Sequence, residues 1–204
     1  MAYILQLDSS ANLDTSVSRR LTAEVAQRWA EAQPGREIRR RDLHVDQLPH
    51  LPTHALHFTD DTRPPGTEAP SAAAVALQQE LLEELSGAGA VVIGAPMYNF
   101  CIPSTLKAWL DYVHVIGLTS PAPQGICPLQ GKPVAVVSAR STPTGADPQA
   151  DFALGPFFTI LGTFMAMAVE GFVVHTDPPA TPEDFHRPIE QVRAELAACV
   201  DRWG

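Results

Sequence analysis

The fold of this chain is decided by residues 90–95, which read Ala90-Val91-Val92-Ile93-Gly94-Ala95. No polar side chain alternates with the apolar ones, so the run predicts a strand buried on both faces, as in a parallel sheet. Pro96 ends this strand. Further strands are predicted at residues 3–7, 37–41, 134–138 and 169–175, of which 37–41 is polar enough for a sheet edge.

Helical patterns lie between these strands. Apolar residues recur at helical spacing, with Pro and Gly at the ends of each run. They predict helices from residue 17 to about residue 33 and over residues 71–87, 103–117, 151–167 and 182–203. Strands that alternate with helices form right-handed βαβ units, with helices on both faces of the sheet. We therefore expect one α/β domain over residues 1–204 with a doubly wound, five-stranded parallel sheet.

Composition narrows the function classes. The 204 residues include 14 Lys and Arg against 23 Asp and Glu, a formal net charge of −9, which argues against nucleic acid as a partner. No apolar run approaches the ~20 residues of a membrane span. Asp8 interrupts the first apolar run, unlike in a secretory signal. We expect a cytoplasmic protein with no membrane partner, whose three cysteines are free thiols.

The ligand is expected beyond the carboxyl ends of the strands, where the strand order reverses. The segment after the first strand contains no GxGxxG and no Walker lysine. It carries hydroxyl groups just before a helix, on Ser9, Ser10, Thr15, Ser16 and Ser18. Hydroxyl and N–H groups at a helix N-terminus favour a phosphate, although Thr15 or Ser16 could simply cap the helix.

A second segment, Met97-Tyr98-Asn99-Phe100, follows the buried strand and Pro96. It places two aromatic rings, an amide and a thioether in one turn at the ligand edge. A planar ring system could bind its polar edge to the amide and the backbone, and its face to the apolar side chains.

These segments resemble a known family. Ser9-Ser10, Ser16-Val17-Ser18 and Ala95-Pro96-Met97-Tyr98-Asn99-Phe100, followed by Ser104-Thr105-Leu106-Lys107, are similar to the FMN-dependent NADH azoreductases, which are also quinone reductases. The resemblance implies a flavodoxin-like fold with strand order 2-1-3-4-5. It also implies FMN as the cofactor, NAD(P)H and a quinone or azo compound as substrates, and a homodimer with sites at the subunit interface.

The resemblance also implies roles for individual residues. By position, Ser10, Ser16, Val17 and Ser18 would cradle the FMN phosphate, and Met97, Tyr98, Asn99 and Phe100 would line the isoalloxazine. The family's third segment, Ser-Arg-Gly-Gly, appears here as Ala139-Arg140-Ser141-Thr142, so only the arginine matches and two glycines carry a Cβ instead. FMN would carry the hydride chemistry by a ping-pong mechanism, without a catalytic side chain.

Alternatives remain open at this point. The chain could be an electron carrier without its own substrate, or a binding module that has lost FMN. His50, His54 and His57 could share a helical face and bind a metal, but Pro52 interrupts that face and surface loops often carry histidine.

Three further features have a plain structural explanation beside a functional one. Cys101 could be an activated thiol, but a packing residue is favoured. Tyr98 could donate a proton to the acceptor, but a pocket wall is favoured. An apolar stripe at helical spacing is expected to serve both the core and a dimer face, and consists of Trp109, Leu110, Tyr112, Val113 and Ile116.

Overall fold

The computed structural model describes residues 2–120, 127–141, 151–175 and 182–204. Its centre is a parallel sheet of five strands in the order β2-β1-β3-β4-β5, which confirms the predicted fold. The strands are β1 (Tyr3–Asp8), β2 (Glu37–Asp42), β3 (Ala90–Gly94), β4 (Pro133–Arg140) and β5 (Ala168–His175).

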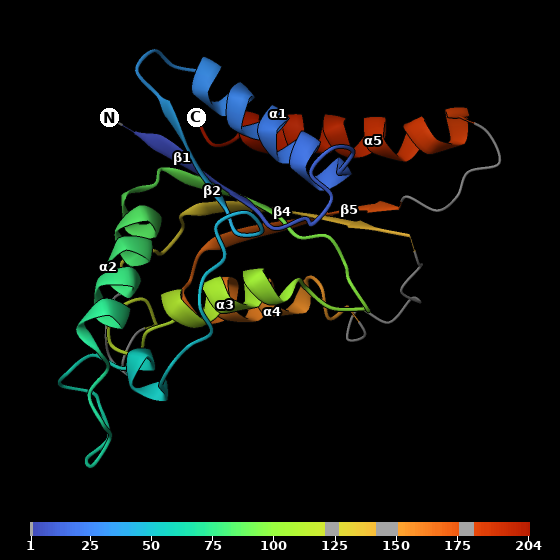
Figure 1. Cartoon of the computed structure of the whole chain (residues 1–204). Coiled ribbons are helices and arrows are strands. Elements are labelled where there is room, and N and C mark those ends of the chain that lie inside the picture. The colour runs from blue at the N-terminus through green and yellow to red at the C-terminus, as the bar shows by residue number, and fades with distance from the viewer. Residues whose placement is uncertain (1, 121–126, 142–150, 176–181) are drawn as a thin grey trace.

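Helices cover both faces of the sheet (Figure 1). The first face carries α1 (Val17–Glu31) and α5 (Pro182–Asp201), and the second carries α2 (Ala72–Gly87), α3 (Ser104–Val113) and the short α4 (Gly155–Phe157). A 3-10 turn, η1 (His54–His57), precedes α2, and a π-helical segment, η3 (Phe158–Phe164), continues α4. Among the described residues, no helix is long and apolar enough to cross a membrane.

Two apolar layers hold the sheet between its helices. All five residues of β3 are buried, as the unbroken apolar run predicts. Val91 and Ile93 pack in the layer with α2 and α3, whereas Ala90 and Val92 pack in the layer with α1 and α5. Because successive residues of a strand face opposite sides, a strand covered on both sides must be apolar throughout.

The predicted helix over residues 103–117 ends earlier, at Val113. The Thr119 hydroxyl donates to the Val113 carbonyl (2.6 Å) and accepts the Val115 N–H (2.9 Å). The Ile116 N–H donates to the carbonyl of His57 in η1 (2.7 Å). These bonds to other segments replace the last helical turn, which local periodicity could not show.

The predicted helix over residues 151–167 is shorter in the structure, residues 155–164, and most of it is a π-helix. Only residues 155–157 are α-helical, and η3 then follows with a wider turn. The Met165 N–H donates to the Ile160 carbonyl, five residues back, at 3.0 Å. The Thr163 hydroxyl donates to the carbonyl of Phe158, also five residues back, at 3.2 Å. This side-chain bond competes with the ordinary helical pattern.

The apolar stripe of α3 belongs to the core. Four of its five residues are wholly buried within this chain, namely Trp109, Leu110, Tyr112 and Val113. They are therefore not free to form a dimer face, and that part of the expectation is wrong for them. Ile116, which lies after the end of α3, is half-buried.

Candidate functional site

The segments that follow β1, β3 and β4 are tied together at one edge of the sheet. The Ser9 hydroxyl donates to the carbonyl of Gly94 at the end of β3 (2.6 Å). The Met97 N–H donates to the carbonyl of Ala139 in β4 (3.0 Å). The structure thus brings the three predicted ligand segments to the same edge.

The serine loop, residues 9–16, leads into α1. Ser10 is buried, its hydroxyl accepts the Asn12 N–H (3.2 Å), and its carbonyl accepts Arg19 Nε (3.1 Å) and Nη2 (2.6 Å). Ser16 is the N-cap of α1, where its hydroxyl accepts the Arg19 N–H and lies 3.1 Å from the hydroxyl of the buried Ser18. Val17, which is half-buried, and the buried Ser18 contribute the first two N–H groups of the helix. These N–H groups have no carbonyl partner within the helix.

Arg19 and Asp42 hold this loop in place, and neither residue was predicted from the sequence. The Arg19 guanidinium binds both carboxylate oxygens of Asp42, at 2.5 and 2.9 Å. That hydrogen bonding holds the pKa of Asp42 below its usual value. Asp42 ends β2 directly beside Asp8, which ends β1. Two adjacent strands that both end in a carboxylate, with an arginine just after the serines, are the signal that could have predicted this contact.

Asp8 lies buried beneath the serine loop. Its carboxylate accepts the Thr22 hydroxyl (2.7 Å) and the Gln6 side-chain amide (2.8 Å). Burial raises the pKa of Asp8, and these hydrogen bonds oppose that rise. A Cβ at Gly94 would lie 3.3 Å from both Asp8 Oδ1 and Thr22 Cγ2. The small residue at Gly94 therefore permits this close packing under the loop.

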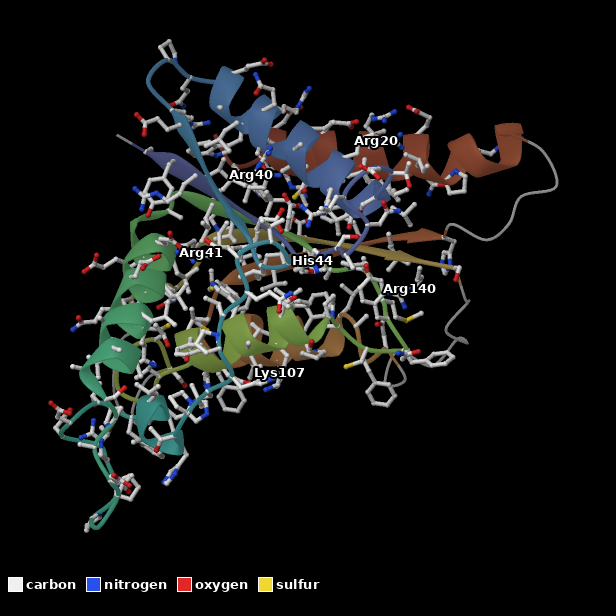
Figure 2. All side chains as sticks on the ribbon, viewed as in Figure 1. Arg20, Arg40, Arg41, His44, Lys107 and Arg140 are labelled. Carbon is white, nitrogen blue, oxygen red and sulfur yellow. The ribbon has the colours of Figure 1, made fainter. Side chains whose placement is uncertain are left out.

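A cavity of about 650 Å³ opens beside the serine loop, between the start of α1 and β2. Its lining includes Ser16, Arg20 from α1 and Arg40 from β2, together with the carboxylates of Asp8 and Asp14. Figure 2 labels both arginines, and no carboxylate binds either of them among the described residues. The cavity thus carries charges of both signs, and Arg40 is close enough to Asp8 to act against the rise in its pKa.

The aromatic turn, Tyr98–Cys101, follows β3 and is closed by its own backbone. The Tyr98 N–H donates to the Cys101 carbonyl (2.9 Å), and the Cys101 N–H donates back to the Tyr98 carbonyl (3.1 Å). Both central residues have positive φ, 49° at Asn99 and 66° at Phe100. Such two-residue turns favour Asn-Gly, so a phenylalanine here costs roughly 1 kcal/mol in backbone strain. Phe100 is nonetheless 58% exposed.

The Tyr98 hydroxyl joins the aromatic turn to the serine loop. It accepts the Ala11 N–H at 2.9 Å and lies 3.2 Å from the Ser10 hydroxyl. The predicted phosphate and flavin segments are therefore in direct contact, across 87 residues of sequence.

The third segment is anchored by an ion pair. Arg140 is buried, and its Nη2 donates to Asp151 Oδ2 at 2.9 Å. Burial acts to raise the pKa of Asp151, but the bonds from Arg140 and from two backbone N–H groups outweigh it, so the pKa lies below its usual value. Ala139 is half-buried and Ser141 is exposed. Thr142 lies outside the described residues.

The remaining candidate residues are the histidines and the cysteines, of which Cys101 belongs to the aromatic turn. Within the described ranges, no group of three or more His, Cys, Asp and Glu side chains could hold a metal ion. His57 Nδ1 instead lies 3.2 Å from the His114 carbonyl. The three cysteines are free thiols, as predicted. Cys127 and Cys199 are buried, but Cys101 is exposed, so the expectation that Cys101 is a packing residue is wrong.

Comparison with known proteins extends these observations. Residues 2–198 match a family with the flavodoxin-like fold. The FMN-dependent NADH:quinone oxidoreductase 2 of Pseudomonas putida is 36% identical over 209 residues, covering 97% of this chain and 99% of that protein. The FMN-dependent NADH:quinone oxidoreductase of Kineococcus radiotolerans is 44% identical over 140 residues, 69% of this chain and 65% of that protein.

Solved structures show the same fold. An azoreductase from Bacillus anthracis superposes with a TM-score of 0.81 at 22% identity, covering 99% of this chain and 100% of that one. An FMN-dependent NADH-azoreductase from the same organism, in complex with FMN, superposes with a TM-score of 0.78 at 18% identity and covers 99% of each chain. The family match and the full-length relatives together place this chain in the flavodoxin-like family of FMN-dependent NADH:quinone oxidoreductases.

Proposed function

We propose that this FMN-dependent enzyme oxidises NAD(P)H and reduces quinones or azo compounds by two electrons, binding the two substrates in turn at one site. The observation that carries the proposal is the junction at Tyr98, where a hydroxyl-rich loop and an aromatic turn meet within hydrogen-bond distance. One loop suits a phosphate and the other suits a planar ring, as the two ends of a flavin mononucleotide require.

The phosphate end of FMN fits the serine loop. The candidate phosphate partners are the first N–H groups of α1, which begins at Val17, and the hydroxyls of Ser10, Ser16 and Ser18. In the structure, the Ser10 hydroxyl pairs with Tyr98, and the Ser16 and Ser18 hydroxyls pair with each other. Unpaired N–H groups and the positive end of the helix dipole both favour a dianion. Arg20 and Arg40 in the adjoining cavity add positive potential. Ser10, Ser16, Val17 and Ser18 would therefore hold the phosphate.

The ring end fits the aromatic turn. Met97, Tyr98, Asn99 and Phe100 would line one side of the isoalloxazine, and the positive φ at two of them turns the backbone tightly there. Ala139, Arg140 and Ser141, with Thr142, would face its other edge. The ion pair from Arg140 to Asp151 would keep that segment in place.

The protein's own contribution is binding, orientation and exclusion of water. When bound, FMN supplies a ring that accepts a hydride from the nicotinamide and returns two electrons to the acceptor. The residues at this edge need only hold the ring and admit each substrate. No acid–base pair is therefore assigned.

We also propose that the enzyme is a homodimer, with a second copy covering apolar side chains near the site. Phe100 and Phe152 are 58% and 60% exposed, and the segments that carry them meet where Cys101 Sγ lies 3.8 Å from the Phe152 carbonyl. Exposed apolar side chains beside a binding site favour contact with another protein surface. Light scattering after size exclusion should give twice the chain mass, and a stable monomer would contradict the dimer.

Steady-state kinetics test the catalytic proposal. The purified protein should absorb near ~450 nm, as oxidised flavins do, and should consume NADH when benzoquinone is added. Varying both substrates should give parallel double-reciprocal lines, whereas intersecting lines would exclude binding in turn. NADH consumption only with a partner reductase would indicate an electron carrier instead. Absence of flavin binding would indicate a module that has lost FMN.

A further inference from the structure

The Tyr98 hydroxyl has an unusual set of partners. It accepts the Ala11 N–H at 2.9 Å and lies 3.2 Å from the Ser10 hydroxyl. The Ser10 oxygen also accepts the Asn12 N–H, and either hydroxyl of the Ser10–Tyr98 pair can donate to the other. One phenolic oxygen therefore bonds to two consecutive residues of the serine loop.

The position of this hydroxyl is set by the aromatic turn. Two backbone hydrogen bonds between Tyr98 and Cys101 close the turn, and two consecutive residues of positive φ give it a tight shape. Ser10, the partner in the serine loop, is held from its other side by Arg19. A movement of either segment would therefore be transmitted to the other through one side chain.

We propose that Tyr98 is a positioning residue that couples the two ends of the cofactor site. Its ring belongs to the segment that faces the flavin, but its hydroxyl orders the serine loop that receives the phosphate. This inference rests on the proposed function, because it assumes that these two segments bind the same FMN molecule. It assigns to Tyr98 a role in phosphate affinity that its place in the aromatic turn does not suggest.

The test compares two flavins that differ only in the phosphate. Tyr98→Phe keeps the ring and removes the hydroxyl, so FMN should bind about 3- to 10-fold more weakly, the effect of one or two lost hydrogen bonds. The affinity for riboflavin, which has no phosphate, should change less than about twofold. Fluorescence titration of the apoprotein measures both. Tyr112→Phe is the matched control, since the buried Tyr112 hydroxyl has no hydrogen-bond partner among the described residues.

A readout without any flavin completes the experiment. Hydrogen exchange at the Ala11 amide should be faster in apo Tyr98→Phe than in the apo wild type and unchanged in Tyr112→Phe. Equal losses of affinity for FMN and riboflavin would overturn the coupling, because Tyr98 would then act on the ring alone. Unchanged FMN affinity would overturn it as well. Wild-type protein that binds neither flavin would instead refute the proposed function, and the coupling with it.

Discussion

The serine loop and the aromatic turn meet at one site but are built by different means. Side chains build the serine loop, where Arg19, Asp42 and the Ser16 cap satisfy its backbone groups. Backbone bonds build the aromatic turn, where two residues hold positive φ at some energetic cost. The serine loop is thus stabilised by many partners, whereas the aromatic turn holds an exposed phenylalanine in a strained conformation.

The largest expected effect is at Arg19. Arg19→Ala removes the bonds to the Ser10 carbonyl and leaves the Asp42 carboxylate without its ion pair, so the free energy of unfolding should fall by about 3 kcal/mol. Urea denaturation measures the change. Arg20→Ala is the control for stability, as this exposed neighbour has no ion pair among the described residues, and should lie within about 0.5 kcal/mol of the wild type. Equal stability of the two variants would show that the serine loop does not depend on this contact.

Acid should weaken the same contact. The folded-state pKa of Asp42 is lowered, first of all by its bond to Arg19, so its stabilisation is complete above the unfolded pKa and is lost as the pH falls through the folded value. At pH 7, Asp42→Asn should lower the free energy of unfolding by about 2 kcal/mol. The difference in the free energy of unfolding between this variant and the wild type should become smaller below about pH 4. A gap that stays constant down to pH 2 would refute the ion pair as its source.

The buried Asp8 responds in the opposite direction. Burial raises its folded-state pKa, so at neutral pH its ionised form costs stability, and this cost is relieved as the pH falls through the folded value. Protonation of Asp8 therefore opposes the loss of stability at Asp42 in acid, and both carboxylates interact with Arg19.

At Phe100 in the aromatic turn, relief of backbone strain should change the stability of the protein and its affinity for FMN in opposite directions. Phe100→Gly removes the side chain from a residue of positive φ, so the apoprotein should gain about 1 kcal/mol of stability, while FMN binding should weaken through loss of a ring contact. Phe152→Gly is the control, because it is similarly exposed but its φ is not positive. It should bring no gain. A less stable Phe100→Gly protein would mean that the turn is not strained.

The smallest expected effect is at Ser16, and it shows whether this residue only caps α1 or also binds FMN. Ser16→Ala removes the N-cap of α1 and should cost about 1 kcal/mol. Ser71 caps α2 in the same way, accepting the Ala74 N–H far from the site, so Ser71→Ala should cost a similar amount. Only Ser16→Ala should also weaken FMN binding in a titration. If both variants bind FMN like the wild type, Ser16 is a cap alone.

Prediction from sequence succeeded where burial leaves a repeating pattern. The uninterrupted apolar residues of β3 indicated a central parallel strand, since a strand covered on both faces has no place for a polar side chain. The same logic failed at Thr119 and Thr163, whose hydroxyls bond to nearby carbonyls at the end of α3 and within η3. One hydrogen bond from a side chain can redirect a helix without changing its apolar periodicity.

The site was predictable to the same extent. Ser16 and Ser18 stand immediately before or within the first turn of a helix, so their place at its N-terminus follows from local chemistry. Arg19 meets Asp42 across 23 residues, and Tyr98 meets Ala11 across 87. Neither contact leaves a local pattern, because each depends on how parallel strands align.

By itself, the amino-acid sequence determined the α/β class, the central strand and the helix caps, and it singled out the two segments proposed to bind the cofactor. These follow from apolar periodicity and from residue chemistry over short distances. Only the tertiary structure decided that Tyr98 would touch the serine loop and that Trp109 would be core. Both outcomes depend on strand register and helix packing, which bring together residues that are far apart in the chain.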